Sequence, residues 1–386
     1  MTNFIPLSKP HFTGNEKKYL TDCIDTSWVS TSGKYVDLFE KKIANFTGAK
    51  FAVSCINGTS ALHISLLLSG VKKNHEVIAP TLSFIAPINA IKYCNANPIF
   101  MDSDDDYCID IKKTIKFIET RTKFKNGITI NDKSKKQISA LIVVHVYGRS
   151  VLMDQLAILC KKRNIAIVED AAEGLGNFYE TGKHQGKHCG TVGNFGCLSF
   201  NGNKIITTGG GGMILTNNKR LAEKAKYLTT TAKNNSIQFI HNEIGYNYRL
   251  TNIQAALGLA QMEKLKNFLS KKKKIYENYL NKLKGNESVS FKTIPQHASS
   301  NYWLNLVEFK KVKKMRDLLY IVDYFKKREI EIRPVWKLNH TQKQYITCQS
   351  FNIENALKLV EKTICLPSSV SITNEEMNKI IRLLNE

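Results

Sequence analysis

The chain is short of acidic side chains relative to basic ones. Its 386 residues include 33 Asp and Glu against 56 Lys and Arg, which gives a formal net charge of +23. A nucleic-acid-binding protein would need these basic residues gathered beside base-reading or stacking elements. They are instead spread along the chain, with short runs such as Lys271 to Lys274, and no helix-turn-helix, zinc-finger or RNA-recognition signature is present. We therefore predict a solvated lysine-rich surface, an anionic substrate and no nucleic-acid partner.

Paired cysteine motifs and long apolar runs are also missing. The nine cysteines never form Cys-x-x-Cys, so neither a zinc ribbon nor a disulfide framework is indicated. His184 and His188 have a spacing that suits a metal only on a helix, and Gly182, Gly186 and Gly190 interrupt this segment, so we expect no metal site. An odd cysteine count without a secretory segment is typical of a reducing compartment, and we expect a cytoplasmic protein. The sequence contains no apolar run of about 18 residues, so we expect no membrane-spanning segment.

Two common nucleotide-binding motifs are absent. The first strand-like run is not followed by G-x-G-x-x-G, which argues against a dinucleotide-binding oxidoreductase. The glycine run TTGGGGM (207–213) lacks the Gly-Lys-Ser/Thr of a P-loop. It is either a flexible turn before the strand MILTN or a close approach of the backbone to a bulky ligand.

Apolar strands alternate with helices through the first 250 residues. FAVSC, EVIAP, ALIVVHVYG and AIVED are continuous apolar runs separated by helical segments, a pattern typical of a largely parallel sheet covered on both faces. The charged stretch 107–137 is expected to be the least structured part. Thr251 is expected to cap a long helix that Gly285 ends. We therefore predict a large α/β domain over 1–250, followed by a linker helix and a small α+β domain over 251–386.

Charged side chains stand where the predicted strands end, which is where ligands bind in such sheets. Asp102, His145 and Asp170 have this position, and Glu173 follows on the next helix. A carboxylate such as Asp170 needs a cation or donor when buried, either a protonated pyridine nitrogen or a structural salt bridge. Lys204 lies between the strand-like run FGCLSF and the glycine run. A partly desolvated lysine there suits Schiff-base chemistry, and a solvated surface lysine is the alternative.

The segment NGTSALH begins a helix directly after the strand FAVSC. Such a turn exposes free backbone N–H groups at the positive end of the helix dipole, which is a ready phosphate site. Ordinary capping by Thr59 or Ser60 explains the same residues. Both interpretations remain open from the sequence.

Seven motifs in order give the chain a family resemblance. They are NGTSALH, PTLSFIAPINAI, PIFMD, HVYG, VEDAAEGLG, SFNGNKIITTGGGGM and GYNYRLTNIQAALGLAQ. The chain resembles the DegT/DnrJ/EryC1/StrS family of sugar aminotransferases, which use pyridoxal 5'-phosphate (PLP) and its amino form, pyridoxamine phosphate (PMP). The resemblance runs from WVSTSG (28–33) to CLPSS (365–369). It implies PLP-transferase fold type I, like aspartate aminotransferase, with a mostly parallel seven-stranded sheet in a large domain and a small C-terminal α+β domain.

The resemblance implies roles for residues around the cofactor. Lys204 matches the Schiff-base lysine that also moves the proton, and Asp170 matches the partner of the pyridine nitrogen. Phe84 matches the aromatic residue that stacks on the ring. Glu173 stands near the cofactor hydroxyl, where many relatives have glutamine.

The resemblance also implies a phosphate site and a shared active site. Thr59, Ser60 and Ser199 match phosphate contacts, and Asn247 matches an asparagine donated by the neighbouring subunit, which implies a homodimer. WVSTSG and RPVW match segments that border the nucleotide-sugar pocket in related enzymes. With Asn201 of SFNGNK, the resemblance implies six substrate contacts: Thr31, Ser32, Gly33, Asn201, Arg333 and Trp336.

Within the family, the chain looks most like enzymes that aminate C4 of a UDP-linked 4-keto-6-deoxy-N-acetylhexosamine with L-glutamate. These act on the way to bacillosamine- or legionaminic-acid-type sugars of surface glycans. The chain reads SFNGNK and TGGGG where many relatives read SFHPxK and TGEGG, which narrows the substrate. Relatives that dehydrate carry histidine in place of the lysine, so Lys204 argues against dehydration. Amination at C3, a GDP- or dTDP-linked substrate, and a non-catalytic scaffold remain as alternatives.

Overall fold

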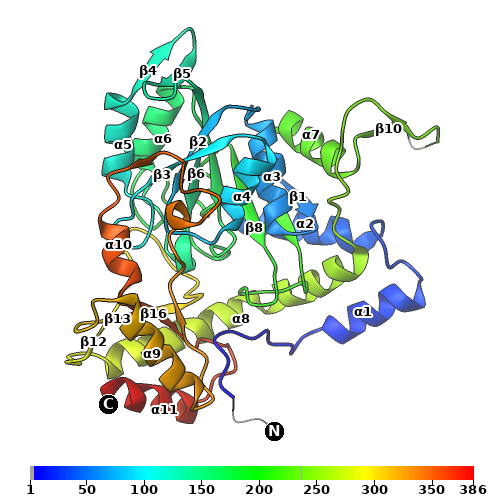
Figure 1. Ribbon diagram of the computed structural model, residues 1–386. Coiled ribbons are helices and arrows are strands. Elements are labelled where there is room, and N and C mark those ends of the chain that lie inside the picture. The colour runs from blue at the N-terminus through cyan, green and yellow to red at the C-terminus, as the bar shows by residue number, and fades with distance from the viewer. Residues whose placement is uncertain (1–3, 236) are drawn as a thin grey trace.

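The computed structural model describes residues 4–235 and 237–386. Figure 1 shows a large sheet with helices on its faces, and the long helix α8 running from it toward a smaller body that holds the C-terminus. The helices are α1 Glu16–Asp25, α2 Lys34–Thr47, α3 Gly58–Leu68, α4 Ala86–Tyr93, α5 Ile111–Thr120, α6 Asp154–Lys162, α7 Lys219–Thr229, α8 Asn252–Lys282, α9 Met315–Lys326, α10 Asn355–Val360 and α11 Asn374–Asn385.

The strands belong to a large sheet, a small sheet and one separate hairpin. Those of the large sheet are β1 Phe51–Cys55, β2 Glu76–Pro80, β3 Asn97–Met101, β4 Thr122–Lys125, β5 Ile128–Asn131, β6 Gln137–Val144, β7 Ala166–Asp170, β8 Phe195–Ser199, β9 Gly212–Thr216 and β15 Ser350–Phe351. The others are β10 Lys233–Asn235 and β11 Ile240–His241 of the hairpin, and β12 Val289–Phe291, β13 Asn305–Phe309, β14 Arg333–Pro334 and β16 Thr363–Leu366 of the small sheet.

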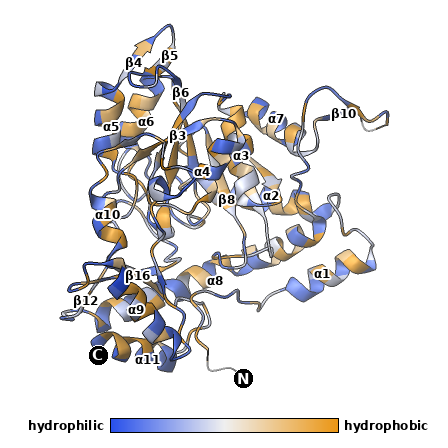
Figure 2. Ribbon diagram, viewed as in Figure 1, coloured by the Kyte–Doolittle hydropathy of each residue, from blue (hydrophilic) through white to orange (hydrophobic). Residues whose placement is uncertain are grey.

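The large sheet confirms the mixed, mostly parallel architecture. Its order is β1-β9-β8-β7-β6-β2-β3-β15, and the hairpin β4–β5 joins at the edge of β6. Strands β3, β2, β6, β7 and β8 are mutually parallel, whereas β9 runs antiparallel to both β8 and β1. The seven strands from β1 to β3 form the predicted sheet, and β15 with the β4–β5 hairpin brings the described sheet to ten strands. Figure 2 shows hydrophobic colour on these strands, between helices whose outer faces are hydrophilic, because both sheet faces are covered.

The prediction that 107–137 is the least structured part was wrong. This stretch forms α5 and the hairpin β4–β5. Asp110 caps α5 by accepting a hydrogen bond from the Lys113 backbone N–H, and Phe117 and Ile118 are buried on its inner face. Lysines on the outer face mask this apolar stripe in the sequence.

The long helix confirms its predicted beginning. Thr251 and Gln254 form a capping box at the start of α8, and the helix ends at Lys282, just before Gly285. It leads into the small antiparallel sheet β12-β13-β16-β14. None of the described helices is long and apolar enough to cross a bilayer.

A short segment of each part of the chain lies against the other part. Strand β15, from the C-terminal part, pairs in parallel with β3 of the large sheet. Near the N-terminus, Ile5 bridges Ile330 beside the small sheet. The division into 1–250 and 251–386 stays a prediction, and two segments cross it.

Candidate active site

A cavity of about 370 Å³ opens at the carboxyl ends of the parallel strands. Val144, Asp170 and Ser199 are the last residues of β6, β7 and β8, and all three line it. This is the edge at which open α/β sheets bind ligands. Its size lies within the range of small-molecule sites, about 300–1,000 Å³.

Lys204 reaches this cavity from the loop after β8. Its Nζ lies 3.1 Å from Glu173 Oε1 and 4.0 Å from the centroid of the Trp303 ring. Only 12% of the Lys204 side chain is exposed, so the solvated-surface alternative does not hold. The Trp303 indole N–H also donates to the carbonyl oxygen of Asn203, 2.6 Å away. Trp303 therefore contacts both the catalytic candidate and the backbone before it, and sequence reasoning missed it.

Asp170 lies in the cavity wall at the end of β7. It is 5% exposed, and its Oδ1 accepts a hydrogen bond of 3.0 Å from the Ala172 backbone N–H. No other hydrogen bond and no ion pair reaches its carboxylate from the residues the structure describes. Burial raises the pKa of the Asp170 carboxyl, and the Ala172 hydrogen bond and the charge of Lys204 only partly oppose this increase. This arrangement fits a protonated ring nitrogen better than a structural salt bridge.

Glu173 pairs with Lys204 from inside the protein. Its Oε1 accepts from Lys204 and its Oε2 accepts from the Tyr147 backbone N–H at 2.7 Å. Burial raises the pKa of the Glu173 carboxyl, and the charge of Lys204 opposes this increase. The Glu173 carboxylate therefore holds the Lys204 amine at the wall of the cavity.

The start of α3 forms the wall where a phosphate fits. Gly58 and Thr59 line the cavity, and the first turn of a helix has N–H groups without intrahelical acceptors. A Cβ on Gly58 would lie only 3.0 Å from the Ser199 Cβ, so the two chain segments approach closely here. The helix is capped by Asn57, whose Oδ1 accepts from the Ser60 N–H at 2.8 Å. Ser60 is buried and does not line the cavity, so its predicted phosphate contact stays a prediction.

Aromatic residues surround the cavity mouth. Phe84 is 54% exposed and lies 6.0 Å from Trp336, centroid to centroid. Trp336 stacks on Tyr147 at 4.3 Å and donates its backbone N–H to the Tyr147 hydroxyl. Arg333 also lines the cavity, with its guanidinium held by Glu331. A half-exposed Phe84 leaves a ring face available to a planar ligand.

The structure brings most of the predicted site residues together. Those lining this cavity are Thr59, Phe84, Asp170, Glu173, Ser199, Asn201, Lys204, Arg333 and Trp336. The donor set fits PLP: an enclosed amine, a buried carboxylate and a helix N-terminus line one cavity of suitable size.

Other predicted residues lie elsewhere in the chain. Thr31, Ser32 and Gly33 line a separate pocket of about 200 Å³ together with Arg249, whose guanidinium donates to the Thr31 carbonyl oxygen. Asn247, two residues before Arg249, is exposed and outside the cavity. Within one chain, these four predicted residues do not reach Lys204.

Asp102 and His145 also stand at strand ends but do not line the cavity. The Asp102 carboxylate accepts from Lys113 Nζ at 2.7 Å and from backbone N–H groups at the start of α10, so it joins helices. His145 donates to Glu169, the residue before Asp170.

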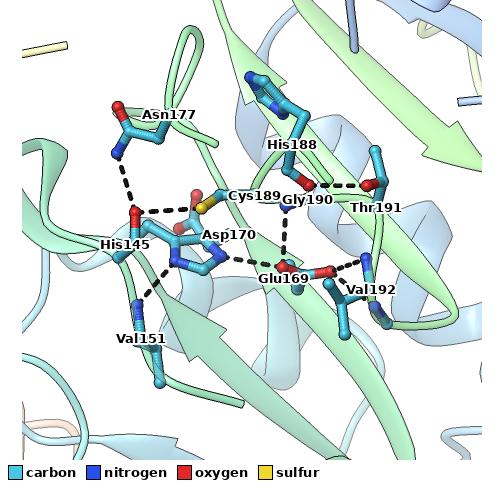
Figure 3. Close-up of polar contacts among 12 residues, drawn as sticks. His145, Val151, Glu169, Asp170, Asn177, His188, Cys189, Gly190, Thr191 and Val192 are labelled. Atoms are coloured by element: carbon cyan, nitrogen blue, oxygen red, sulfur yellow. Dashed lines mark hydrogen bonds and ion pairs between the residues drawn. The ribbon is translucent and has the colours of Figure 1, made fainter. Parts of the chain in front are cut away.

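A buried carboxylate next to Asp170 in the sequence, that of Glu169, binds His145 and a following loop (Figure 3). Glu169 is fully buried, and its oxygens accept from His145 Nε2 and from the backbone N–H groups of Gly190, Val192 and Gly193 at 2.6–2.9 Å. Burial alone would raise the pKa of Glu169, but the hydrogen bonds from His145 and the backbone outweigh it and hold the pKa below its usual value. This network fixes the loop 188–193 to β7 beside Asp170.

The histidine pair in the glycine-rich loop has other contacts. His184 Nε2 lies 3.4 Å from Asp154 Oδ1, and His188 Nε2 accepts from the Gly176 N–H at 2.9 Å. Burial lowers the pKa of His188 to about 4. Across the described residues, no group of three His, Cys, Asp or Glu side chains is arranged to hold a metal ion.

Known proteins are similar to this chain over most or nearly all of its length. The model of the DegT/DnrJ/EryC1/StrS aminotransferase family matches residues 10–385. A GDP-perosamine synthase of Escherichia coli O157:H7 is 37% identical over 384 residues, covering 99% of this chain and 98% of the relative. A UDP-4-amino-4,6-dideoxy-N-acetyl-beta-L-altrosamine transaminase of Campylobacter jejuni is 34% identical over 299 residues, covering 77% and 70%. The crystal structure of the aminotransferase TlmJ from Streptoalloteichus hindustanus has a similar fold, with a TM-score of 0.87 at 24% identity over 99% and 98% of the two chains.

Proposed function

The chain belongs to the DegT/DnrJ/EryC1/StrS family of PLP-dependent sugar aminotransferases, and we propose that it aminates C4 of a GDP-linked 4-keto-6-deoxy sugar with L-glutamate. The observation that carries the catalytic part is the enclosed Lys204 amine, held by Glu173 in a cavity that Asp170 also lines. An enclosed amine beside a carboxylate is what proton transfer at a substrate carbon requires.

The nucleotide in this proposal differs from the UDP expected from the sequence motifs. The GDP-perosamine synthase matches almost the whole chain at 37% identity, whereas the UDP-sugar transaminase matches 77% of it at 34%. These relatives favour GDP. A UDP-linked 4-keto-6-deoxy-N-acetylhexosamine is the second candidate, and its link to bacillosamine- or legionaminic-acid-type sugars stays a prediction.

Each residue of the cavity would have a separate role in the amino transfer. PLP, when bound, supplies the electron-accepting ring that this transfer needs. Asp170 would hold the ring nitrogen, and the start of α3 with Ser199 would hold the phosphate. Lys204 would carry the proton to and from the reacting carbon of donor and acceptor. Glu173 keeps that amine inside the cavity, away from bulk water.

The substrate is tested by a panel of sugars with the purified protein, PLP and L-glutamate. The panel contains 4-keto-6-deoxy sugars linked to GDP, UDP and dTDP, and one 3-keto sugar, with amino-sugar products measured by mass spectrometry. We expect the highest kcat/KM with the GDP-linked 4-keto sugar. The Lys204→Ala variant is expected to form no amino-sugar product. A higher kcat/KM with the UDP-linked sugar or with the 3-keto sugar would refute the proposed substrate. It would leave the aminotransferase activity unchallenged.

We also propose that two copies of the chain share their active sites. Asn247 and the Thr31–Gly33 segment lie outside the cavity of their own chain, and the segment lines the separate pocket beside Arg249. Nearby, the β10–β11 arm extends away from the body in Figure 1, and Phe239 and Ile244 on it are exposed. Exposed apolar side chains on an extended arm favour burial against a partner.

Mixed variants test this sharing. Lys204→Ala and Asn247→Ala chains are each expected to be inactive alone. After unfolding and refolding together, half of the dimers are mixed, and one of their two sites has both native residues. Recovery of about a quarter of wild-type activity is expected from this symmetry. No recovery, or a monomer by light scattering, would refute the shared site.

A further inference from the structure

Trp303 holds the catalytic lysine in two ways. Its ring face lies 4.0 Å from Lys204 Nζ, and its indole N–H donates to the Asn203 carbonyl oxygen. The Trp303 side chain is itself packed parallel to Tyr147, with the rings 6.3 Å apart and 11° from parallel. The position of this indole therefore constrains the Lys204 amine, together with the hydrogen bond from Lys204 to Glu173.

Lys272 fixes the backbone of Trp303 from α8. It is 2% exposed, and its Nζ donates to the Trp303 carbonyl oxygen at 2.7 Å and to the Ser368 carbonyl oxygen. The Ser368 hydroxyl also donates to the Trp303 carbonyl, at 3.2 Å. Trp303 stands just before β13 and Ser368 just after β16, which are neighbours in the small sheet. Lys272 thus joins α8 to the edge of the small sheet that faces the cavity.

Lys272 has no carboxylate partner among the residues described by the structure, which is unusual for a lysine this deeply buried. A neutral amine has two N–H donors, which match its two carbonyl acceptors, whereas an ammonium would bury a third N–H without one. Burial lowers the pKa of Lys272 to about 7. The side chain is therefore built as a hydrogen-bond donor rather than as half of an ion pair.

We propose that Lys272 is a positioning residue for Lys204, acting through the Trp303 carbonyl. The inference rests on the proposed role of Lys204 as the catalytic amine. This positioning role gives a reason for a lysine at a buried position in α8, where an apolar side chain would pack without the cost of burying an amine.

The test compares Lys272→Met with Lys273→Met on the same helix. Lys273 is 60% exposed, so its variant is the matched control. The readout is the rate at which acetic anhydride modifies Lys204 at pH 7 in folded, cofactor-free protein, measured on the Lys204 peptide by mass spectrometry. Releasing the amine from the ring is expected to speed this reaction roughly threefold to tenfold in Lys272→Met, the scale of a cation–π contact. The control is expected to stay within twofold of wild type.

Kinetics of the holoenzyme give a second readout. Misplacing a catalytic group lowers kcat more than it raises KM, so Lys272→Met is expected to lose roughly tenfold in kcat with KM changed less than threefold. Trp303→Phe is expected to speed acetylation too, and the double variant no further, because both act through one contact.

Acetylation within twofold of wild type in a folded Lys272→Met protein, or additive effects in the double variant, would overturn the proposal. If Lys272→Met does not fold, Lys272→Gln, whose side chain is one bond shorter than that of lysine, is the second variant and should speed acetylation at least twofold; acetylation at the wild-type rate would overturn the proposal. Acetylation needs neither cofactor nor sugar. If the wild-type protein shows no amino transfer, the proposed function is refuted. The acetylation rate of Lys204 would still decide whether Lys272 positions Lys204.

Discussion

Glu169→Gln keeps the shape of a buried side chain and replaces one hydrogen-bond-accepting oxygen with an NH₂ group, which can only donate. Oε2 of Glu169 accepts from His145 Nε2 and the Gly190 N–H, and Oε1 accepts from the N–H groups of Val192 and Gly193 (Figure 3). A glutamine has one oxygen and one NH₂ group. In either orientation, the NH₂ group faces two donors that have lost their acceptor.

The size of the effect follows from these contacts. Each buried donor left without an acceptor costs about 1–3 kcal/mol. His145 cannot compensate by changing tautomer, because its Nδ1 accepts from the Val151 N–H at 3.2 Å. We expect Glu169→Gln to lower the free energy of unfolding by about 3–5 kcal/mol at pH 7, similar to breaking a buried ion pair.

The effect has a defined pH dependence. The fold holds the pKa of Glu169 below its unfolded value of 4.5, so the carboxylate contributes stability above that pH and loses it as the pH falls through the folded pKa. The difference between Glu169→Gln and wild type should therefore be constant near neutral pH and shrink below about pH 4.5.

Urea unfolding of cofactor-free protein, followed by circular dichroism, measures this difference. Glu223→Gln on the exposed face of α7 is the control and is expected within about 0.5 kcal/mol of wild type. A loss below 1 kcal/mol for Glu169→Gln, or a loss that grows as the pH falls, would refute the reasoning from its four donors.

Three further predictions concern the separate pocket at Gly33 and the cavity itself. Gly33→Ala should lower the melting temperature by several degrees, because the φ of Gly33 is 148° and a Cβ would lie 2.3 Å from the Asn252 side chain; an unchanged melt would contradict this. Asp170→Asn should weaken PLP binding about tenfold or more by absorbance titration, since a neutral amide gives up the ionic partner of the ring nitrogen; unchanged affinity would place the ring elsewhere. Ser199→Ala should weaken PLP by about tenfold and phosphate-free pyridoxal by less than twofold; equal losses would exclude a phosphate contact.

The sequence located the residues whose chemistry depends on local position. Asp170 and Ser199 end apolar strands, and Lys204 follows one, so alternation of strands and helices was enough to bring them to one edge. The helix start after β1 was also predicted, although Asn57 provides the cap in place of Thr59 or Ser60.

What the sequence could not locate depends on distant contacts. Trp303 is 100 residues from Asn203, and Lys272 is 96 from Ser368, so no spacing rule links them. Strand β15 has two residues, too few for a hydrophobic pattern, and it is recognised only by its pairing with β3.

Binding of the cofactor and the amino transfer both depend, in the proposed function, on the amine of Lys204. The most direct measurement is the position of the cofactor after the protein is mixed with PLP, reduced with borohydride and digested for mass spectrometry. We expect the reduced cofactor on the Lys204 peptide, its loss when L-glutamate is added before reduction, and its return when a nucleotide-linked 4-keto-6-deoxy sugar follows. Cofactor on another lysine, or on Lys204 regardless of L-glutamate, would contradict this expectation.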